Sequence, residues 1–266
     1  MLSSVEEINM FKILKKLLKK SDVENESLSD EYLEIVRKFG ELGINITDCL
    51  KLELEVLEKI YVAIVSLYKK YPEIPVGYIE ELNLQKIKEG IADTHFFSTS
   101  KRVHYDKASH YNTNRGLCIS LNKEYFVDIS KFAIKMELVN LSIDCVYEYA
   151  IAHEFGHCID ILMAKECGFL KQSDALERKE VSYFLNNLPV SYNIVSEIIY
   201  NKFPKRNRSY ISVGGELSNL MGETASMNEG EAFAEAVAFD YFNLDNSTAK
   251  EILDNYHIWL EEKRRS

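Results

Sequence analysis

Apolar residues recur every three or four positions in the first part of the chain, which is the spacing of one helix face. These stretches are residues 4–20, 30–39 and 47–71. Pro72 and Pro75 end the third stretch, because proline cannot continue a helix. We therefore predict an N-terminal helical region at residues 1–74 and a second domain at residues 75–266.

The middle of the chain has a different pattern. Between Thr94 and Tyr125, short segments rich in aromatic and β-branched residues alternate with Ser, Asn and Gly, which predicts strands. The segments are THFFST, RVHY and GLCISLN. After Asp128 the helical period returns and continues to the end of the sequence. The pattern as a whole predicts an α+β fold, mostly helical, with one small mixed sheet.

Composition favours a globular protein without a membrane span. Hydrophobic residues make up 46% of the 266 residues, and no run approaches the roughly eighteen apolar residues of a transmembrane helix. The first twenty residues have neither an uninterrupted apolar core nor a small-residue cleavage site, so we expect no secretory signal. Five cysteines without a C-x-x-C pair indicate reduced thiols and a cytoplasmic location, with export by another route left open.

The charge of the chain bears on whether it binds nucleic acids or membranes. The net charge of −10 argues against a nucleic-acid binder, because phosphate binding needs a basic surface. Residues 4–20 carry five lysines, which suit either a membrane-surface helix or a solvated face. We favour the solvated face, since membrane binding requires an apolar face that nothing covers.

The candidate chemistry lies in AIAHEFGHCID, residues 150–160. His153 and His157 are four residues apart, so on a helix both imidazoles can reach one metal ion. Glu154 follows the first histidine and points to the side of the metal, where it can take a proton from a water that the metal activates. The alternative is two ordinary histidines on a structural helix.

A catalytic zinc ion needs a third protein ligand, and NEGEAFAEAVAFD at residues 228–240 is the best source. Asn228 can cap a helix that carries Glu231 and Glu235 four residues apart. We predict that Glu231 binds zinc and that Glu235 orients an imidazole N–H, although the pair also suits a solvated acidic stripe. The rival ligands are Asp160, Glu223 and Glu229. We expect Asp160 to act around the helix, not on the ion.

The motifs HEFGHxxD and NExExFAEA resemble the gluzincin metallopeptidases related to anthrax lethal factor. They are similar also to metallopeptidase-like domains of phage head and other mobile-element proteins. Over residues 75–245 the resemblance implies a zincin-like fold, in which the small sheet packs on the active-site helix, and one Zn²⁺ per chain. In that family the two glutamates of ExFAE bind and support the zinc, which corresponds to Glu231 and Glu235.

The resemblance has a further implication and one departure. Residues 116–126 resemble the edge strand that holds an extended substrate, which places the substrate on Leu117, Cys118, Ile119, Ser120 and Leu121. Lethal-factor-like enzymes usually carry a tyrosine seven residues before the zinc glutamate, as an oxyanion donor. Thr224 stands at that position here, and Tyr210 and Tyr241 are candidate substitutes.

Two hypotheses follow. The first is a zinc endopeptidase that cleaves a protein or peptide substrate with Glu154 as general base. The second is a weak or vestigial gluzincin scaffold that serves as a binding or structural protein of a phage or mobile element. The intact set of His153, Glu154 and His157 favours the peptidase, because a scaffold needs no general base. Thr224 slightly favours the scaffold.

Overall fold

The computed structural model describes most of the chain after residue 28. The described residues are 29–87, 92–98, 110–126, 130, 136–137, 140–173, 175–177, 179–181, 189–202, 220–221 and 224–265. The predicted helix at residues 4–20 lies outside them, as do the segment RVHY, Glu223 and Tyr210.

Two helices form the first part of the described chain. They are α2 (Asp30–Glu41) and α3 (Leu54–Lys70), with a 3-10 turn η1 (Thr47–Cys49) between them. The prediction of a helix that begins near Thr47 was wrong, because α3 begins at Leu54. Cys49 in the turn and Leu52 after it are buried, and the Cys49 thiol donates to the carbonyl oxygen of Leu82. This packing against the sheet directs the chain away from a continuous helix.

The sheet is mixed, as predicted. Its strands are β1 (Ile79–Gln85), β2 (Ala92–Ser98), β3 (His110–Asn122) and β4 (Leu176–Glu177). The order is β1-β3-β2, with β1 parallel and β2 antiparallel to β3, while β4 pairs with the start of β3. Helices dominate the rest of the described chain, so the α+β, mostly helical fold is confirmed.

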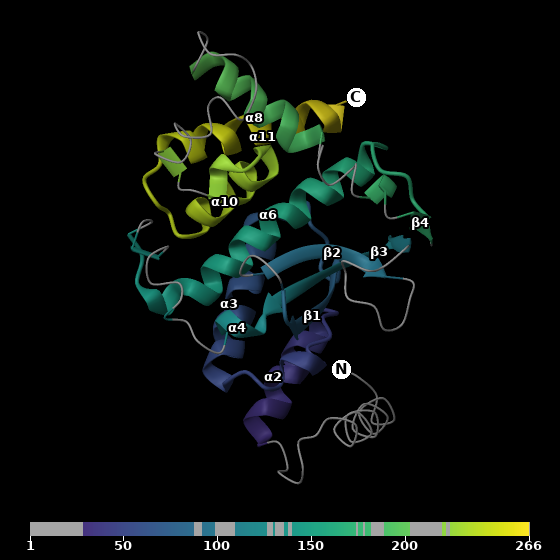
Figure 1. Cartoon of the computed structure of the whole chain (residues 1–266), viewed down its shortest axis with the longest axis vertical. Helices are drawn as coiled ribbons and strands as arrows, with labels where there is room; N and C mark the ends of the chain where they lie inside the picture. Colours follow the sequence, from purple (N-terminus) through teal and green to yellow (C-terminus); the bar gives the residue numbers. More distant parts are fainter. Residues whose placement is uncertain are drawn as a thin grey trace.

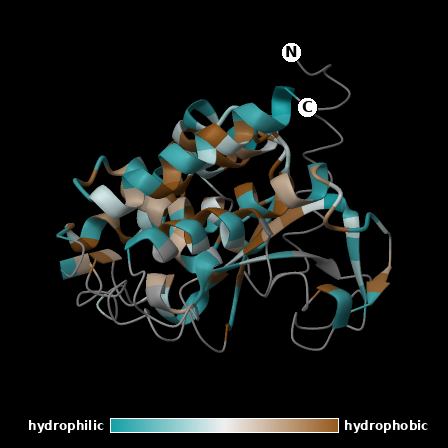
Figure 2. Cartoon of the chain, turned by 90° about the horizontal axis from the view of Figure 1, so that it is seen from above, coloured by the Kyte–Doolittle hydropathy of each residue, from teal (hydrophilic) through white to brown (hydrophobic). Residues whose placement is uncertain are grey.

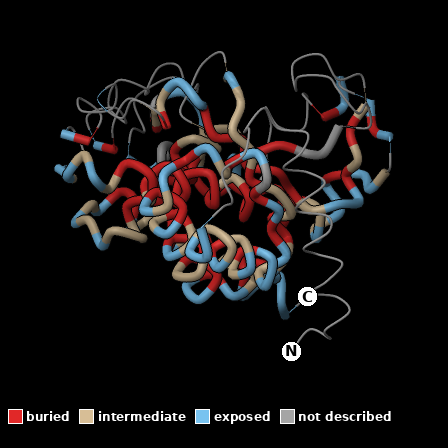
Figure 3. Tube along the Cα trace, turned by 90° about the horizontal axis from the view of Figure 1, so that it is seen from below, coloured by how far each residue is buried: buried red, intermediate tan, exposed pale blue. Residues whose placement is uncertain are grey.

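Helix α6 (Val146–Glu166) runs through the middle of the molecule (Figure 1), and nearly all of its residues are buried. The buried parts of the described chain lie together in the interior of the molecule (Figure 3). The sheet and α3 lie on one side of α6. The C-terminal helices lie on the other, where α10 makes the most extensive contact. They are α8 (Pro189–Lys202), α10 (Glu229–Tyr241) and α11 (Ser247–Arg265), with the 3-10 turn η5 (Thr224–Ser226) before α10.

One hydrophobic core extends from Ile35 on α2 to Leu260 on α11. Hydrophobic residues gather on the inner faces of the helices (Figure 2). The aromatic ring of Tyr68 on α3 meets that of Phe155 on α6 edge to face, with centroids 5.4 Å apart. Residues on both sides of position 74 thus share this core, and the division of the chain there stays a prediction. Among the helices that the structure describes, none has the length and apolar character of a membrane span.

Candidate metal centre

Helix α6 places the two histidines of the motif side by side. Their ring centroids are 5.0 Å apart, as expected for residues one turn apart, and the ring planes are nearly perpendicular. His153 is buried, whereas 17% of the His157 side chain is exposed. The helix on which this pairing depends runs without a break through the motif.

Helix α10 brings a carboxylate to the same point. Asn228 caps this helix as predicted, since its side-chain oxygen accepts from the Glu231 N–H at 3.0 Å. Glu231 Oε2 lies 3.1 Å from His153 Nε2, and Glu231 Oε1 lies 3.6 Å from His157 Nε2. Ligand atoms of the three residues all lie within 4.8 Å of one another.

The approach of α10 to α6 depends on Gly156, which lies between the two histidines. A Cβ atom at this position would lie 2.6 Å from the Cα atom of Ala234, closer than van der Waals contact allows. Glycine at 156 and alanine at 234 therefore let the two helix backbones meet. This close contact lies one turn from Glu231, and it sets how near the Glu231 carboxylate comes to the imidazoles.

The separations suit a tetrahedral zinc ion. With metal–ligand bonds of about 2.0–2.1 Å, two ligands of such an ion lie roughly 3.3 Å apart. The two His–Glu231 distances of 3.1 and 3.6 Å, each to a different oxygen of the carboxylate, are close to that value, and all three ligand atoms lie within 4.8 Å of one another. Two imidazole nitrogens and one carboxylate also form the donor set of His₂Glu catalytic zinc sites.

Electrostatics also favour a cation at this position. Burial disfavours the charged imidazole of His153, yet Glu231 and Glu235 outweigh this effect and raise the pKa of His153 to about 10. The carboxylates around His153 therefore attract positive charge strongly. A zinc ion and the proton on His153 would compete for the same group.

Glu235 lies behind His153, one turn along α10 from Glu231. Its Oε2 atom is 3.7 Å from His153 Nδ1, which is buried and finds no hydrogen-bond partner among the described residues. The same oxygen accepts a hydrogen bond from the Tyr149 hydroxyl of α6. Burial, followed by the charge of Glu235, raises the pKa of Tyr149 well above its usual value, so the phenol remains a donor.

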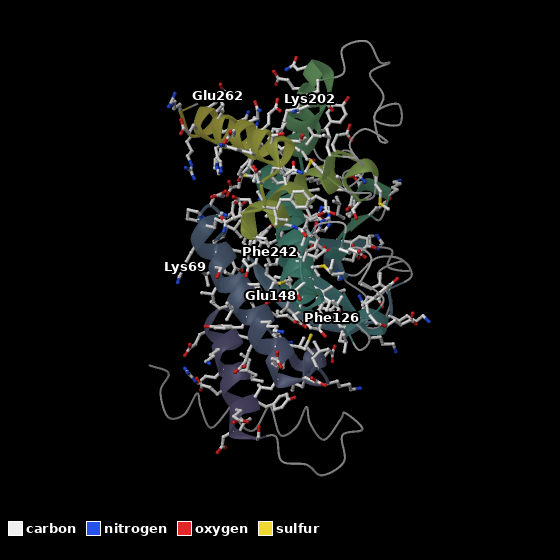
Figure 4. The ribbon with its side chains drawn as sticks, turned by 90° about the vertical axis from the view of Figure 1, so that its left-hand side faces the viewer. Lys69, Phe126, Glu148, Lys202, Phe242 and Glu262 are labelled. Atoms are coloured by element: carbon white, nitrogen blue, oxygen red, sulfur yellow. The ribbon has the colours of Figure 1, made fainter. Side chains whose placement is uncertain are left out.

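The ends of the two helices also lie together. The ring of Phe242, just after α10, stacks on Tyr149 with centroids 6.0 Å apart. Phe242 and Glu148, labelled in Figure 4, mark the end of α10 and the beginning of α6. Because Glu231 meets His157 and Phe242 meets Tyr149, the two helices run in opposite directions.

Glu154 is buried on the side of α6 that faces the sheet. Thr94 Oγ1 on β2 donates to Glu154 Oε2 at 2.8 Å and lies 3.1 Å from the Glu154 carbonyl oxygen. A hydroxyl has a single hydrogen, and the shorter contact to the carboxylate is the better bond. The strand thus fixes one oxygen of the candidate general base.

The rival ligands have other partners. Asp160 is fully buried, and its Oδ1 atom accepts from the backbone N–H of Ser191, in the first turn of α8. Burial raises the pKa of Asp160 to about 7. Glu229 Oε1 accepts from the Ser196 hydroxyl of α8 at 3.3 Å. Neither residue belongs to the metal-ligand group found among the described residues.

The prediction of an edge strand at Leu117–Leu121 was wrong. Residues 117–121 of β3 pair with β1 on one side and with β2 on the other, so their backbone groups already serve the sheet. β2 is the end strand of the order β1-β3-β2 and packs against α6. The edge beside the candidate centre therefore belongs to β2.

The position of the oxyanion donor stays a prediction. Thr224 lies in η5, which packs against α10. Tyr241 lies ten residues after Glu231 on α10, which is about 15 Å along a helix. Burial and then the charges of Glu148 and Cys145 raise the pKa of Tyr241, which places this tyrosine beside the start of α6. Whether Tyr241 or Thr224 supplies the donor therefore stays a prediction.

Two residues beside the centre, Tyr149 and Thr94, were not predicted from the sequence. Tyr149 is four residues before His153, so the same helical spacing that paired the histidines placed it on their face of α6. Thr94 gave no such signal, because its contact with Glu154 joins segments sixty residues apart.

Comparisons with known proteins add no family assignment. No protein-family profile matches the chain, and neither a curated protein nor a solved structure matches it. The candidate metal centre therefore rests on the geometry of the residues themselves.

Proposed function

We propose that this protein is a zinc-dependent endopeptidase of the gluzincin type, with one Zn²⁺ held by His153, His157 and Glu231. The observation that carries the proposal is the convergence of these three donors on one point, with Glu154 next to His153 in the same helix. A catalytic zinc site keeps one position open for a reactant. The partial exposure of His157 and Glu231, 17% and 25% of their side chains, is compatible with access from solvent.

The residues of the centre divide the chemistry among them. When bound, zinc would polarise the scissile carbonyl and lower the pKa of the attacking water. Glu154 accepts a proton from this water as its oxygen adds to the carbonyl carbon. Glu154 then delivers the proton to the amide nitrogen as the C–N bond breaks. Thr94 holds the Glu154 carboxylate in place for both transfers.

The substrate of this proposal is a protein or peptide that lies along β2. An extended peptide can add to the end strand of a sheet through main-chain hydrogen bonds. β2 is such a strand, and its Thr94 contacts the candidate base. This arrangement would bring the scissile bond beside Glu154. The five cysteines form no disulfide, which suits the cytoplasmic location that we propose for this activity.

A second candidate is a gluzincin-like scaffold with weak or lost catalysis. The observation in its favour is Thr224, which stands where the related peptidases have a tyrosine. The loss of one oxyanion donor costs about 2.7–4 kcal/mol of transition-state stabilisation. A scaffold would still bind zinc.

The deciding experiment combines metal content with cleavage of a peptide library by the full chain. We expect one zinc per chain and hydrolysis that a chelator abolishes and added zinc restores. The Glu154→Gln variant should keep zinc, but its turnover should fall by orders of magnitude, because an amide cannot accept the proton. The matched control is Glu166→Gln, at the exposed end of the same helix, which should behave as wild type. Zinc binding without any cleavage would favour the scaffold.

A further inference from the structure

Tyr149 has a contact that the proposed chemistry does not use. The phenol donates to Glu235 Oε2, and this same oxygen is the carboxylate atom nearest to His153 Nδ1, at 3.7 Å. All three side chains are at least nine-tenths buried. An unsatisfied polar atom in such a place costs free energy, and His153 Nδ1 is unsatisfied among the described residues.

A histidine that binds zinc through Nε2 donates its Nδ1–H to a neighbouring acceptor, which fixes the ring orientation. Glu235 is the acceptor at hand, because its Oε2 atom lies 3.7 Å from Nδ1, just beyond hydrogen-bond distance. The free carboxylate of a glutamate has three rotatable torsions. How well the Glu235 carboxylate accepts from His153 therefore depends on which other groups hold it in place.

The ring of Tyr149 is itself well held. It belongs to the rigid helix α6, is buried, and stacks on Phe242 at 6.0 Å. Its hydroxyl thus lies at a fixed distance from the helix that carries His153. We propose that Tyr149 is a positioning residue for the metal centre, one that holds Glu235 Oε2 in place to accept from the Nδ1–H of His153.

This inference rests on the metal site of the proposed function, but it does not require peptidase activity. Its test is the zinc dissociation constant of the full chain, measured by competition with a chromophoric chelator. The loss of a carboxylate behind a ligand costs about 10–100-fold in metal affinity. We expect that range for Glu235→Gln, and a roughly three- to tenfold loss for Tyr149→Phe, which retains the ring and the acceptor.

The control for the lost hydroxyl is Tyr147→Phe. Tyr147 is buried on the same helix two residues earlier, and its ring packs against Phe126 at 5.3 Å. Residues two apart lie on different faces of a helix, so this change should leave zinc affinity within twofold of wild type. Thermal unfolding of the metal-free variants shows whether each one folds.

A double-mutant cycle separates positioning from a general effect on packing. If Tyr149 acts through Glu235, Tyr149→Phe should not weaken zinc binding further in a Glu235→Gln background. An equal loss of zinc affinity in both backgrounds overturns the inference, and so does a zinc affinity of Tyr149→Phe that is within twofold of wild type or higher.

Should Tyr149→Phe not fold, Tyr149→4-aminophenylalanine keeps a donor at the same place. It should bind zinc within threefold of wild type, and a loss as large as that of Glu235→Gln overturns the inference.

The outcomes for the two proposals are distinct. If zinc binding depends on Tyr149 but no library peptide is cleaved, the proposed peptidase activity is contradicted and the positioning role of Tyr149 stands. If the wild-type chain cleaves peptides but Tyr149→Phe has unchanged zinc affinity, only the positioning role of Tyr149 is contradicted. A wild-type chain that binds no zinc removes both.

Discussion

Thr94 and Glu154 join the end strand of the sheet to the central helix through a hydrogen bond of 2.8 Å. Thr94 and Glu154 are 7% and 5% exposed, so water offers little compensation if the bond is lost. Because the bond occupies Oε2, the carboxylate cannot turn freely about its last torsion. The candidate general base is therefore oriented by the strand on which we place the substrate.

Removal of this hydroxyl should slow catalysis more than it weakens binding. We expect Thr94→Val to lower kcat about tenfold, a fraction of the 10²–10⁴ that general acid–base catalysis contributes, with KM changed less than threefold. Thr94→Ser keeps the donor and should remain within threefold of wild type. Both kcat and KM are obtained from initial rates of cleavage of one peptide that the wild-type protein cleaves in the peptide library. An unchanged kcat in Thr94→Val would show that the bond has no part in orienting the base.

The contact between Gly156 and Ala234 leads to a prediction on stability. Gly156→Ala places a methyl group 2.6 Å from the Ala234 Cα, where only a shift of the helix backbones can relieve the overlap. We expect a loss of about 1–3 kcal/mol in the free energy of unfolding, the usual cost of overpacking. Zinc affinity should fall as well, because α10 carries Glu231. Urea unfolding of the metal-free chain and chelator competition measure the two effects.

Gly40 on α2 provides the matched control. A Cβ atom there meets nothing within 4 Å, and the residue lies inside a helix. Gly40→Ala should therefore stabilise the protein by about 0.5–1 kcal/mol, because alanine loses less backbone entropy in a helix. Equal effects of the two substitutions would mean that the close approach at Gly156 is not what the structure indicates.

The identity of the third ligand separates Glu231 from its rival Glu229. Glu231→Gln should reduce zinc content to a small fraction of one ion per chain, because the amide replaces the anionic ligand. Glu229→Gln should retain zinc, since Glu229 contacts Ser196 of α8 instead of an imidazole. Metal analysis after dialysis decides between them. Full zinc retention in Glu231→Gln would exclude Glu231 as a ligand.

The parts of the centre that could be predicted from sequence are those set within single helices. His153 and His157 share a face because of the 3.6-residue period, and the Asn228 cap fixes the start of α10. The convergence of Glu231 with the histidines was expected from the capped helix that carries Glu231 and Glu235, and also from the resemblance of the motifs. Its structural cause is the contact between Gly156 and Ala234.

What could not be predicted depends on pairings between distant segments. The sequence of β1, IEELNLQ, contains good helix-forming residues, and it becomes a strand through its parallel pairing with residues 117–122 of β3. That pairing encloses the middle of β3 and makes β2 the end strand. A local pattern can show that GLCISLN is a strand, but it cannot show which strands flank it. The contact of Thr94 with Glu154 has the same origin.

Asp160 leads to a prediction on pH dependence. Its carboxyl group is fully buried, with Oδ1 on the Ser191 N–H and Oδ2 without a hydrogen-bond partner among the described residues. Burial raises the pKa of Asp160 from 3.8 to about 7, so the folded protein binds a proton that the unfolded chain releases at lower pH. The stabilisation is complete below pH 4 and is lost as the pH rises through about 7. Between pH 5 and pH 8 the loss should be about 2–3 kcal/mol.

Asp160→Asn tests this sign directly. The asparagine side chain can still accept from the Ser191 N–H through its carbonyl oxygen, yet it carries no charge at any pH. We therefore expect the variant to be at least as stable as wild type at pH 8, with the difference between the two proteins declining by about 2–3 kcal/mol on going to pH 5. Urea unfolding with a chelator present measures both proteins without a contribution from zinc. If wild type instead gained stability relative to the variant as the pH rose from 5 to 8, the Asp160 carboxylate would be favoured in the fold. A cation or a further donor would then have to lie beside it.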